Sequence, residues 1–460
     1  MRYIALSVVL LLTGCAAPPA NPVASPGLQP LQISADQRYL EYADGTPFFW
    51  LGDTAWELFH RLDREEATFY LEDRAAKGFT VIQAVALAEL DGLNTPNPYG
   101  HTPLIDNDPA QPNPAYFEHV DFIVEKANQL GMYIGMLPTW GDKFNLKWGV
   151  GPVVFTEANA AAYGTWIAER YRDDDIIWIT GGDRNPETPE QEAIVRSMAE
   201  AIDAVHGGAQ LMTYHPMGGF LSSQWFQDDP WLDFNMYQSG HGRFDNPNYQ
   251  MTERGYALTP TKPVLDGEPR YEDHPVNWNP DEGWFMDFDT RQAAYWPMLS
   301  GAMGHTYGNH NIWQMWQPGR DPISSARTPW REAVGHIGSA QVGYMRQFFE
   351  ARPWTLLRPA TNQLQGDNPE GPMHQRMAVA EDGSYLVAYS PYGTPLTLDL
   401  RLINAANHTA YWFDPRTGTS SEITELPLEG THTFTPPGMP ERGNDWVLLV
   451  EDASQEWAAP

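Results

Sequence analysis

The sequence predicts an α/β protein in which a (β/α)8 TIM barrel is followed by a small antiparallel β-sandwich. The chain has 460 residues, and a single hydrophobic core rarely grows beyond about 250 to 300 residues, so two domains are expected. Up to about residue 345, short apolar runs alternate with segments of helical period. Beyond about residue 350 the pattern changes to alternating apolar and polar residues bounded by turn formers.

Eight apolar runs are expected to form the strands of the barrel, within a domain spanning residues 36–350. Several segments between them have apolar residues that recur at three and four positions, as an amphipathic helix requires. Eight strands with intervening helices over about 300 residues fit a (β/α)8 barrel. The strands are expected at Phe48–Leu51, Thr80–Val85, Tyr133–Leu137, Ile176–Thr180, Gln210–Tyr214, Phe234–Tyr237, Pro263–Leu265 and Ala302–Tyr307, and helices at Arg64–Lys77, Pro114–Leu130, Glu157–Tyr171 and Pro189–Val205.

Residues 351–455 are expected to form the β-sandwich. Alternation predicts strands at Ser384–Tyr389 and Leu398–Leu402, and the apolar run Trp446–Val450 closes the domain. The segment Asp414–Gly418 follows the aromatic run Tyr411–Phe413 and is a turn signal between two strands.

The N-terminus has the order of a bacterial lipoprotein signal peptide, residues 1–15. A basic Arg2 precedes the apolar run Ile4–Leu12, which is far shorter than the roughly 20 residues of a spanning helix. The ending Leu12-Thr13-Gly14-Cys15 resembles a lipobox, so Cys15 is the expected lipidation site; the alternative is an ordinary signal peptide with a chance cysteine. Residues 16–35 are rich in proline and alanine and are expected to be a linker. We therefore expect a lipid-anchored protein of the bacterial cell envelope, facing the periplasm or attached to the outer membrane.

Composition excludes several classes of function. The net charge of −31 would repel nucleic acid, so no nucleic-acid partner is expected. The single cysteine rules out internal disulfides, and no His-x-x-x-His or His-Glu-x-x-His spacing is present, so no metal site is predicted. The sequence contains no Gly-x-Ser-x-Gly elbow, phosphate-binding glycine loop or dinucleotide fingerprint, and no cofactor is expected.

Two of the predicted strands end in a carboxylate that follows glycine. The fourth strand leads into Gly181-Gly182-Asp183, and the seventh leads into Asp266-Gly267-Glu268. In a barrel of this kind the carboxyl ends of the strands face the active site. Glycosidic hydrolysis needs one carboxyl group to protonate the leaving oxygen and a second to act at the anomeric carbon, so Asp183 and Glu268 are the predicted catalytic pair. The structural alternative is that Asp183 caps the following helix and Glu268 pairs with Arg270 or Arg184.

The other strand ends agree with a sugar-binding site. Aromatic faces stack on the C–H surfaces of sugars, and polar side chains bind their hydroxyl groups. The side chains expected to bind substrate are Asp53 and Trp56 after strand one, Gln83 on strand two, Trp140 after strand three, Arg184 and Asn185 beside Asp183, His215 after strand five, Tyr237 at the end of strand six, and His305 and Tyr307 on strand eight.

Five runs resemble the apiosidase-like barrel of glycoside hydrolase family 140: Trp50–Trp56, Lys77–Gln83, Gly181–Asn185, Asp266–Pro269 and Gly301–Gly308. The resemblance covers about residues 36–345. It implies a retaining mechanism with Asp183 as general acid/base and Glu268 as nucleophile, and a substrate class of apiose-containing side chains of the pectin rhamnogalacturonan-II. The arrangement also resembles the large clan of retaining barrel glycosidases, which usually carry Glu rather than Asp on strand four. Residues 355–453 are similar to the β-sandwich labelled as collagen-binding in the same proteins.

The sequence thus predicts a retaining glycoside hydrolase acting on plant or algal polysaccharide, most specifically an apiosidase-like enzyme. The expected partners are an oligo- or polysaccharide and the membrane that holds the lipid anchor. The alternative hypothesis is a non-catalytic, polysaccharide-binding surface lipoprotein that keeps the barrel as a scaffold.

Overall fold

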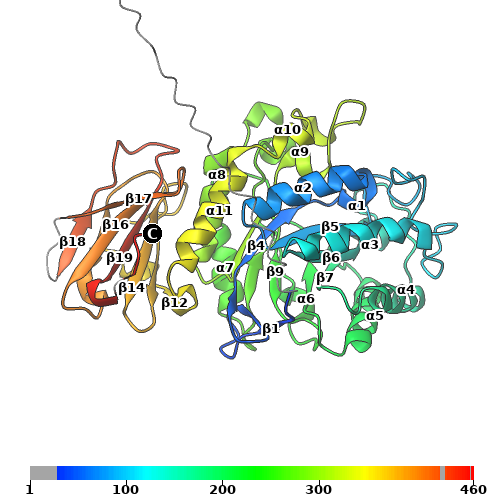
Figure 1. Cartoon of the computed structure of the whole chain (residues 1–460), viewed down its shortest axis with the longest axis horizontal. Coiled ribbons are helices and arrows are strands. Elements are labelled where there is room, and N and C mark those ends of the chain that lie inside the picture. Colours follow the sequence, from blue (N-terminus) through cyan, green and yellow to red (C-terminus); the bar gives the residue numbers. More distant parts are fainter. Residues whose placement is uncertain (1–27, 425–429, 456) are drawn as a thin grey trace, which may run out of the picture.

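The computed structural model describes residues 28–424, 430–455 and 457–460. The predicted signal peptide, its Cys15 and most of the predicted linker lie outside the described residues. Figure 1 shows an α/β part, coloured blue to yellow, beside a part built of antiparallel strands, coloured orange to red. Among the described residues, no helix is both long and apolar enough to cross a bilayer.

A small antiparallel sheet precedes the α/β part and packs beneath it. It contains β1 (Leu31–Ile33), β2 (Leu40–Tyr42) and β3 (Pro47–Phe48). The rings of Phe48 and Tyr133 meet edge to face with their centroids 5.4 Å apart. The prediction that residues 16–35 are all linker is therefore wrong at its end, because buried Leu31 belongs to a strand that packs on the same core as Tyr133.

Eight parallel strands form the centre of the α/β part, in two sheets. Each overlaps one of the predicted strands. The first sheet has the order β11 (Gly304–Tyr307), β4 (Trp50–Thr54), β5 (Val81–Leu87), β6 (Tyr133–Thr139), β7 (Ile176–Gly181) and β8 (Met212–His215), and the second pairs β9 (Asn235–Tyr237) with β10 (Val264–Asp266).

The two sheets meet at both edges through single backbone hydrogen bonds. The amide of Asp233, before β9, donates to Met212 O on β8 at 2.9 Å, and the amide of Met303, before β11, donates to Val264 O on β10 at 3.0 Å. In the described residues the eight strands are therefore a six-stranded and a two-stranded sheet, rather than one continuous ladder.

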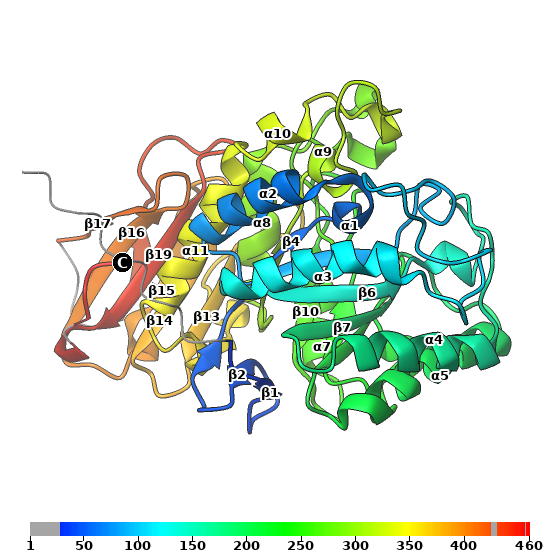
Figure 2. The same cartoon turned by 45° about the vertical axis from the view of Figure 1, so that its right-hand side comes forward.

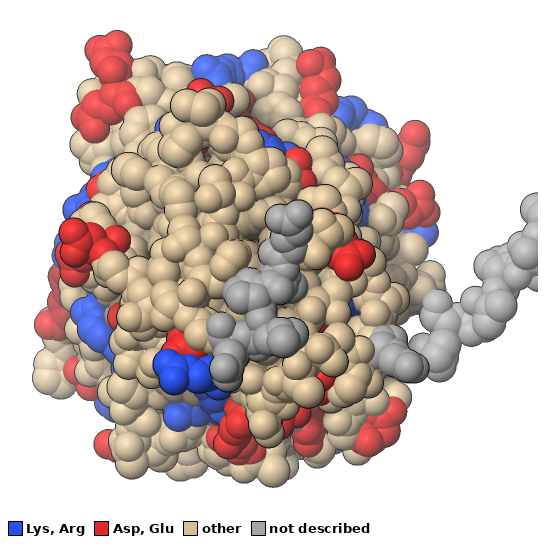
Figure 3. Space-filling model, turned by 90° about the vertical axis from the view of Figure 1, so that its left-hand side faces the viewer, with Lys and Arg blue, Asp and Glu red and all other residues tan. Residues whose placement is uncertain are grey.

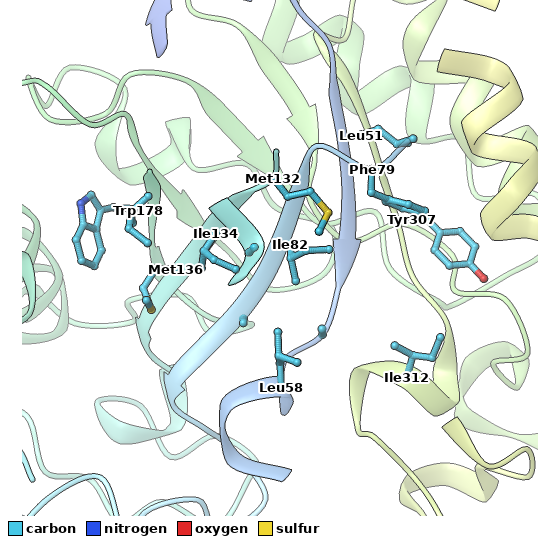
Figure 4. Close-up of a cluster of buried hydrophobic side chains, with 14 of the residues drawn as sticks. Leu51, Leu58, Phe79, Ile82, Met132, Ile134, Met136, Trp178, Tyr307 and Ile312 are labelled. Atoms are coloured by element: carbon cyan, nitrogen blue, oxygen red, sulfur yellow. The ribbon is translucent and has the colours of Figure 1, made fainter. Parts of the chain in front are cut away.

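Side chains alternate between two apolar cores, as the period of a strand requires. Trp50, Val81 and Ile177 point to an inner core. Their neighbours along the strands point to an outer core beneath the helices, which Figure 4 shows for Leu51, Ile82, Ile134 and Trp178 among others. The covering helices are α1 (Leu58–Arg61), α2 (Arg64–Ala76), α3 (Pro114–Gln129), α4 (Glu157–Arg170), α5 (Pro189–His206), α6 (Ser223–Phe226), α7 (Asn248–Tyr256), α8 (Asp287–Met298), α9 (His310–Trp313), α10 (Trp330–Ala333) and α11 (Ile337–Glu350).

The C-terminal part consists of antiparallel sheets. One has the order β12 (Leu357–Pro359), β13 (Arg376–Ala380), β14 (Tyr385–Ser390), β19 (Trp446–Asp452), β16 (His408–Asp414) and β17 (Thr419–Glu422), and the other pairs β15 (Leu396–Asp399) with β18 (Thr431–Phe434). The predicted strand Leu398–Leu402 ends early. Asp399 Oδ1 accepts a hydrogen bond from the amide of Arg401 at 3.0 Å, which favours a 3-10 turn over Leu400–Leu402.

The C-terminal sheets dock on α8 and α11, which lie between the two parts in Figures 1 and 2. The guanidinium of Arg291 on α8 donates twice to buried Asp445, at 3.0 and 2.8 Å. The rings of Tyr295 and Tyr389 stack with their centroids 4.9 Å apart. Figure 3 shows the opposite, outward face of the C-terminal part, where charged side chains lie mainly around the margin.

Candidate active site

A cavity of about 710 Å³ opens at the carboxyl ends of the parallel strands. Loops after the strands build it, so its walls come from segments far apart in the sequence. Five tryptophans and three carboxylates are the main groups that line it, which is a lining suited to sugars. The lining residues are Trp56, Glu89, Leu90, Trp140, Trp148, Gly149, Val150, Asp183, Met217, Gly218, Gln238, His241, Glu268, Tyr271, Trp278, Trp313, Ile323 and Ser324.

Asp183 reaches the cavity from a strained turn after β7. The φ angles of Gly181, Gly182 and Asp183 are 90°, 117° and 50°, all in the left-handed region. A Cβ on Gly181 would lie 2.7 Å from His215 O, and one on Gly182 would lie 2.8 Å from the ring of Trp140. Glycine is therefore needed at both positions for the turn to bring Asp183 to the cavity.

The carboxyl group of Asp183 is held by two donors at the same oxygen. Trp148 Nε1 donates to Oδ2 at 2.9 Å, and Arg184 Nη1 donates to it at 3.0 Å. Burial and the nearby charge of Glu268 nevertheless raise the pKa of Asp183 to about 6. Asp183 can therefore hold a proton in weakly acidic solution, as a general acid must.

Glu268 lies on the loop after β10, which is fixed through its backbone. Gly240 N donates to Glu268 O at 3.0 Å, and Gln83 Nε2 donates to Gly267 O at 2.9 Å. A Cβ on Gly267 would lie 2.5 Å from the sulfur of Met236. The loop thus packs too closely on β9 for any residue larger than glycine before Glu268.

Two histidines contact the two oxygens of the Glu268 carboxyl group. His241 Nε2 lies 3.0 Å from Oε1, and His215 Nε2 lies 3.3 Å from Oε2. Burial alone would raise the pKa of Glu268, but these histidines outweigh it and lower the pKa to about 2. The environment therefore moves the pKa values of the two carboxyl groups apart, so that Glu268 is ionised while Asp183 can stay protonated.

His215 connects the two carboxylate residues. Its Nδ1 accepts a hydrogen bond from the amide of Asp183 at 3.3 Å. Because Nδ1 accepts this bond, the ring N–H is on Nε2, which lies 3.3 Å from Glu268 Oε2. His215 is itself buried behind the cavity wall, where its ring meets that of Trp56 at 5.5 Å.

Both structural alternatives for the carboxylates are wrong. The cap of α5 is Thr188, whose hydroxyl accepts from the amide of Gln191, and not Asp183. Arg270 donates to Phe244 O and to Gln292 Oε1, and Arg184 donates to Asp183, so neither arginine pairs with Glu268.

Some predicted substrate ligands lie at the cavity and others support it. Trp56 and Trp140 line it, with their ring centroids 5.2 Å apart. Arg184 holds Asp183, and Gln83 holds the Glu268 loop. Asn185 Oδ1 accepts from the amide of Met217 at 2.9 Å, so its side chain joins two loops and does not line the cavity.

Four predicted substrate ligands are wrong, because their side chains point away from the cavity. Asp53 Oδ2 accepts from Arg74 Nε at 2.5 Å and from Tyr70 OH at 2.6 Å, beneath α2. The other three are buried as well. The hydroxyl of Tyr237 lies 2.7 Å from that of Thr252, that of Tyr307 donates to Glu272 at 2.5 Å, and His305 is paired in register with Leu51, which faces the outer core.

Several cavity residues were missed by the sequence prediction. Glu89 lies two residues beyond the end of β5, so the strand-end rule could have found it. Burial, followed by the charges of Glu57, Asp142 and Asp183, raises its pKa well above the usual range. Trp148 and Trp278 lie well inside long loops, where one sequence gives no signal. The described residues hold no group of three or more histidine, cysteine or acidic side chains that could bind a metal ion.

Comparisons with protein families agree with the division into two parts. Residues 34–356 match the family described as "Apiosidase-like, catalytic domain". Residues 359–451 match a second family, described as "Putative collagen-binding domain of a collagenase". Among curated proteins, none matches the chain.

Solved structures include two that are similar over nearly the whole chain. One is titled a glycoside hydrolase; it is 34% identical with a TM-score of 0.86, and the match covers 94% of this chain and 98% of that one. The other is titled a glycoside hydrolase family 5 protein from Bacteroides vulgatus ATCC 8482; it is 32% identical with a TM-score of 0.86, and the match covers 94% of this chain and 95% of that one.

Proposed function

The chain belongs to the apiosidase-like family and is similar over nearly its whole length to a solved glycoside hydrolase, and from that premise we propose that it is a retaining glycosidase. Asp183 is its general acid/base and Glu268 its nucleophile. The observation that carries the proposal is the opposite tuning of two carboxyl groups that face one cavity, with the pKa of Asp183 raised and that of Glu268 lowered.

The mechanism follows from these two protonation states. In the first step Glu268 attacks the anomeric carbon, the glycosidic C–O bond breaks, and Asp183 gives its proton to the leaving oxygen. In the second step Asp183 takes a proton from water, the water oxygen attacks the anomeric carbon, and Glu268 leaves as a carboxylate. His241 and His215 orient the two oxygens of Glu268 for both steps.

The substrate class we propose is plant or algal polysaccharide, most specifically the apiose-containing side chains of pectin. The tryptophan walls of the cavity support a sugar substrate. The five motif runs that resemble family 140 support apiose as that sugar.

We further propose that the eight parallel strands act as one closed barrel, since a backbone hydrogen bond bridges each of the two seams between the sheets. We also propose that Cys15 carries a lipid anchor, for which incorporation of labelled palmitate, lost in Cys15→Ser, is the test.

The test of the proposed function is the release of reducing sugar from a panel of pectic and other plant and algal polysaccharides. The protein from residue 28 should release sugar from at least one of them. Glu268→Gln should lower the rate by roughly a thousandfold or more, as loss of a nucleophile implies. A protein that binds glycans without cleaving any would favour the non-catalytic binding lipoprotein, and equal rates in both forms would remove Glu268 from the mechanism.

A further inference from the structure

The loop between β6 and α4, residues 140–156, carries an exposed tryptophan beside the catalytic pair. Trp148 is 42% exposed and lines the cavity. Its indole Nε1 donates to Asp183 Oδ2 at 2.9 Å. A large aromatic side chain held half in solvent by a bond to a half-buried carboxyl group is unusual for a residue that only packs.

This loop is fastened to the loop that carries Asp183. The carbonyl oxygen of Trp148 accepts from Arg184 Nη2, and the Arg184 guanidinium lies 4.1 Å from the centroid of the indole ring. Asn145 Nδ2 donates to Asn185 O at 2.8 Å. Lys147 Nζ forms an ion pair with Glu187. Three residues of one loop are thus joined to three residues of the other, which places the indole N–H at Asp183.

The close approach of the loops is built into the backbone. Gly141 N donates to Gly182 O at 3.0 Å, and a Cβ on Gly141 would lie 2.5 Å from Arg184 Cγ. Gly149 follows Trp148 with a φ of 94°, and a Cβ there would lie 2.9 Å from Asp142 Oδ2. Glycines on both sides of Trp148 therefore allow the loop to reach the acid/base turn.

The two donors at Asp183 decide which oxygen can carry a proton. Oδ2 accepts from Trp148 Nε1 and from Arg184 Nη1, so its lone pairs are engaged. Within the described residues Oδ1 has no hydrogen-bond partner. We propose that Trp148 is a positioning residue, which holds Oδ2 so that Oδ1 carries the proton delivered to the leaving oxygen. This inference rests on the proposed glycosidase function of Asp183.

Removing the indole N–H of Trp148 should change the pKa of Asp183 in a predictable direction. The groups that act on Asp183 are Glu268, Arg184, His215 and Glu89. The hydrogen bond from Trp148 favours the ionised form of Asp183 and so lowers its pKa. Without this bond the pKa of Asp183 should rise, and the general acid should stay protonated to higher pH.

The test uses Trp148→Phe, which keeps an aromatic ring and removes the donor. Val153→Ala is the matched control, because Val153 is exposed on the same loop and does not line the cavity. Protein labelled with carbon-13 at its aspartate carboxyl carbons is titrated by NMR, and the Asp183→Asn spectrum assigns the Asp183 signal. The pKa of Asp183 should rise by roughly half a unit to one unit in Trp148→Phe and stay unchanged in the control.

A second readout follows where the wild-type protein hydrolyses a glycoside. Trp148→Phe should lose more rate on substrates with poor leaving groups than on aryl glycosides that leave without protonation, since only the former need the acid. Trp148→His, which keeps an N–H donor, should titrate like the wild type. Trp148→Leu, which also removes the donor, replaces Trp148→Phe should that variant fail to fold.

Three results would overturn the role of Trp148: an unchanged Asp183 pKa in Trp148→Phe, an equal rate loss on both classes of substrate, or a raised pKa in Trp148→His. A wild-type protein without hydrolytic activity would instead contradict the proposed function. The NMR titration needs no turnover, so the two failures are distinguishable.

Discussion

At the scale of single residues, the site depends on two histidines that hold one carboxylate. His241 and His215 reach opposite oxygens of Glu268, at 3.0 and 3.3 Å. A buried carboxyl group without such partners would be protonated and unable to attack carbon. The histidines therefore act through Glu268, as positioning residues for the proposed nucleophile.

His241→Ala should shift the acidic limb of the pH profile of kcat/KM upward. His241 favours the ionised form of Glu268, so its removal raises the pKa of Glu268 from about 2. Activity needs Glu268 ionised and is lost as the pH falls through that pKa, so the loss should begin roughly one to two pH units higher. His432→Ala, on β18, is the control and should keep the wild-type profile. An unchanged acidic limb in His241→Ala would show that the histidine does not tune Glu268.

The basic limb of the same profile should report Asp183. Its pKa is raised to about 6, and the general acid is lost as the pH rises through that value. The wild-type kcat/KM should therefore fall above about pH 6, by roughly tenfold per pH unit. The measurement is the initial rate at low substrate concentration between pH 3 and pH 9. Activity that stays flat to pH 8 would contradict Asp183 as the acid.

At the scale of elements, a buried ion pair joins β4 to α2. Asp53 on β4 accepts from Arg74 and Tyr70 on α2, and the side chains of Asp53 and Arg74 are fully buried. The bond fixes the helix across the strand that leads to Trp56. Asp53 therefore supports the fold of the cavity wall rather than the substrate.

Asp53→Ala should destabilise the protein by about 3 to 5 kcal/mol, because it leaves the Arg74 guanidinium buried without its partner. Urea unfolding followed by circular dichroism measures the loss. Asp36→Ala, which removes an exposed ion pair with Arg358, should cost less than about 1 kcal/mol. A stable Asp53→Ala protein with a raised KM would restore Asp53 as a substrate ligand.

Sequence reasoning located every strand of the parallel sheets, and its errors have a common cause. Strand periodicity finds an element but does not fix which alternate side chains face inward. For that reason Asp53, Tyr237, His305 and Tyr307 were placed in the cavity, although all four point outward. Asp183 and Glu268 lie after glycines, past the strand ends, where alternation no longer applies. The rule that the carboxyl ends of the parallel strands face one active site placed both of them at the cavity. Trp148 could not be found, because only the folded loop brings it to Asp183.

At the scale of the whole molecule, the C-terminal sheets and the α/β part share one interior. The buried Arg291–Asp445 pair and the stacked rings of Tyr295 and Tyr389 join α8 to the sheets. The outer apolar core of the α/β part continues into Phe413 and Val447. An interface of this kind indicates that the C-terminal sheets are a structural partner of α8 and α11 rather than an independently moving domain.

The two parts should therefore unfold together. Differential scanning calorimetry of the protein from residue 28 should show a single cooperative transition. A protein that ends at residue 350 should be insoluble or should melt at a much lower temperature, because it exposes the apolar faces of α8 and α11. Two separate transitions, or a stable shortened protein, would show that the C-terminal sheets are an independent domain.

In the proposed mechanism Glu268 forms a covalent bond to the sugar while Asp183 gives and takes the proton. Intact-protein and peptide mass spectrometry tests it most directly, on Asp183→Ala incubated with an activated glycosyl fluoride of the sugar released in the polysaccharide panel. Glu268 can still attack such a substrate without an acid, but hydrolysis of the adduct is slowed because no base remains. We expect the mass of one glycosyl group on the peptide that contains Glu268. A glycosyl group on another residue, or turnover with no adduct at any time, would contradict it.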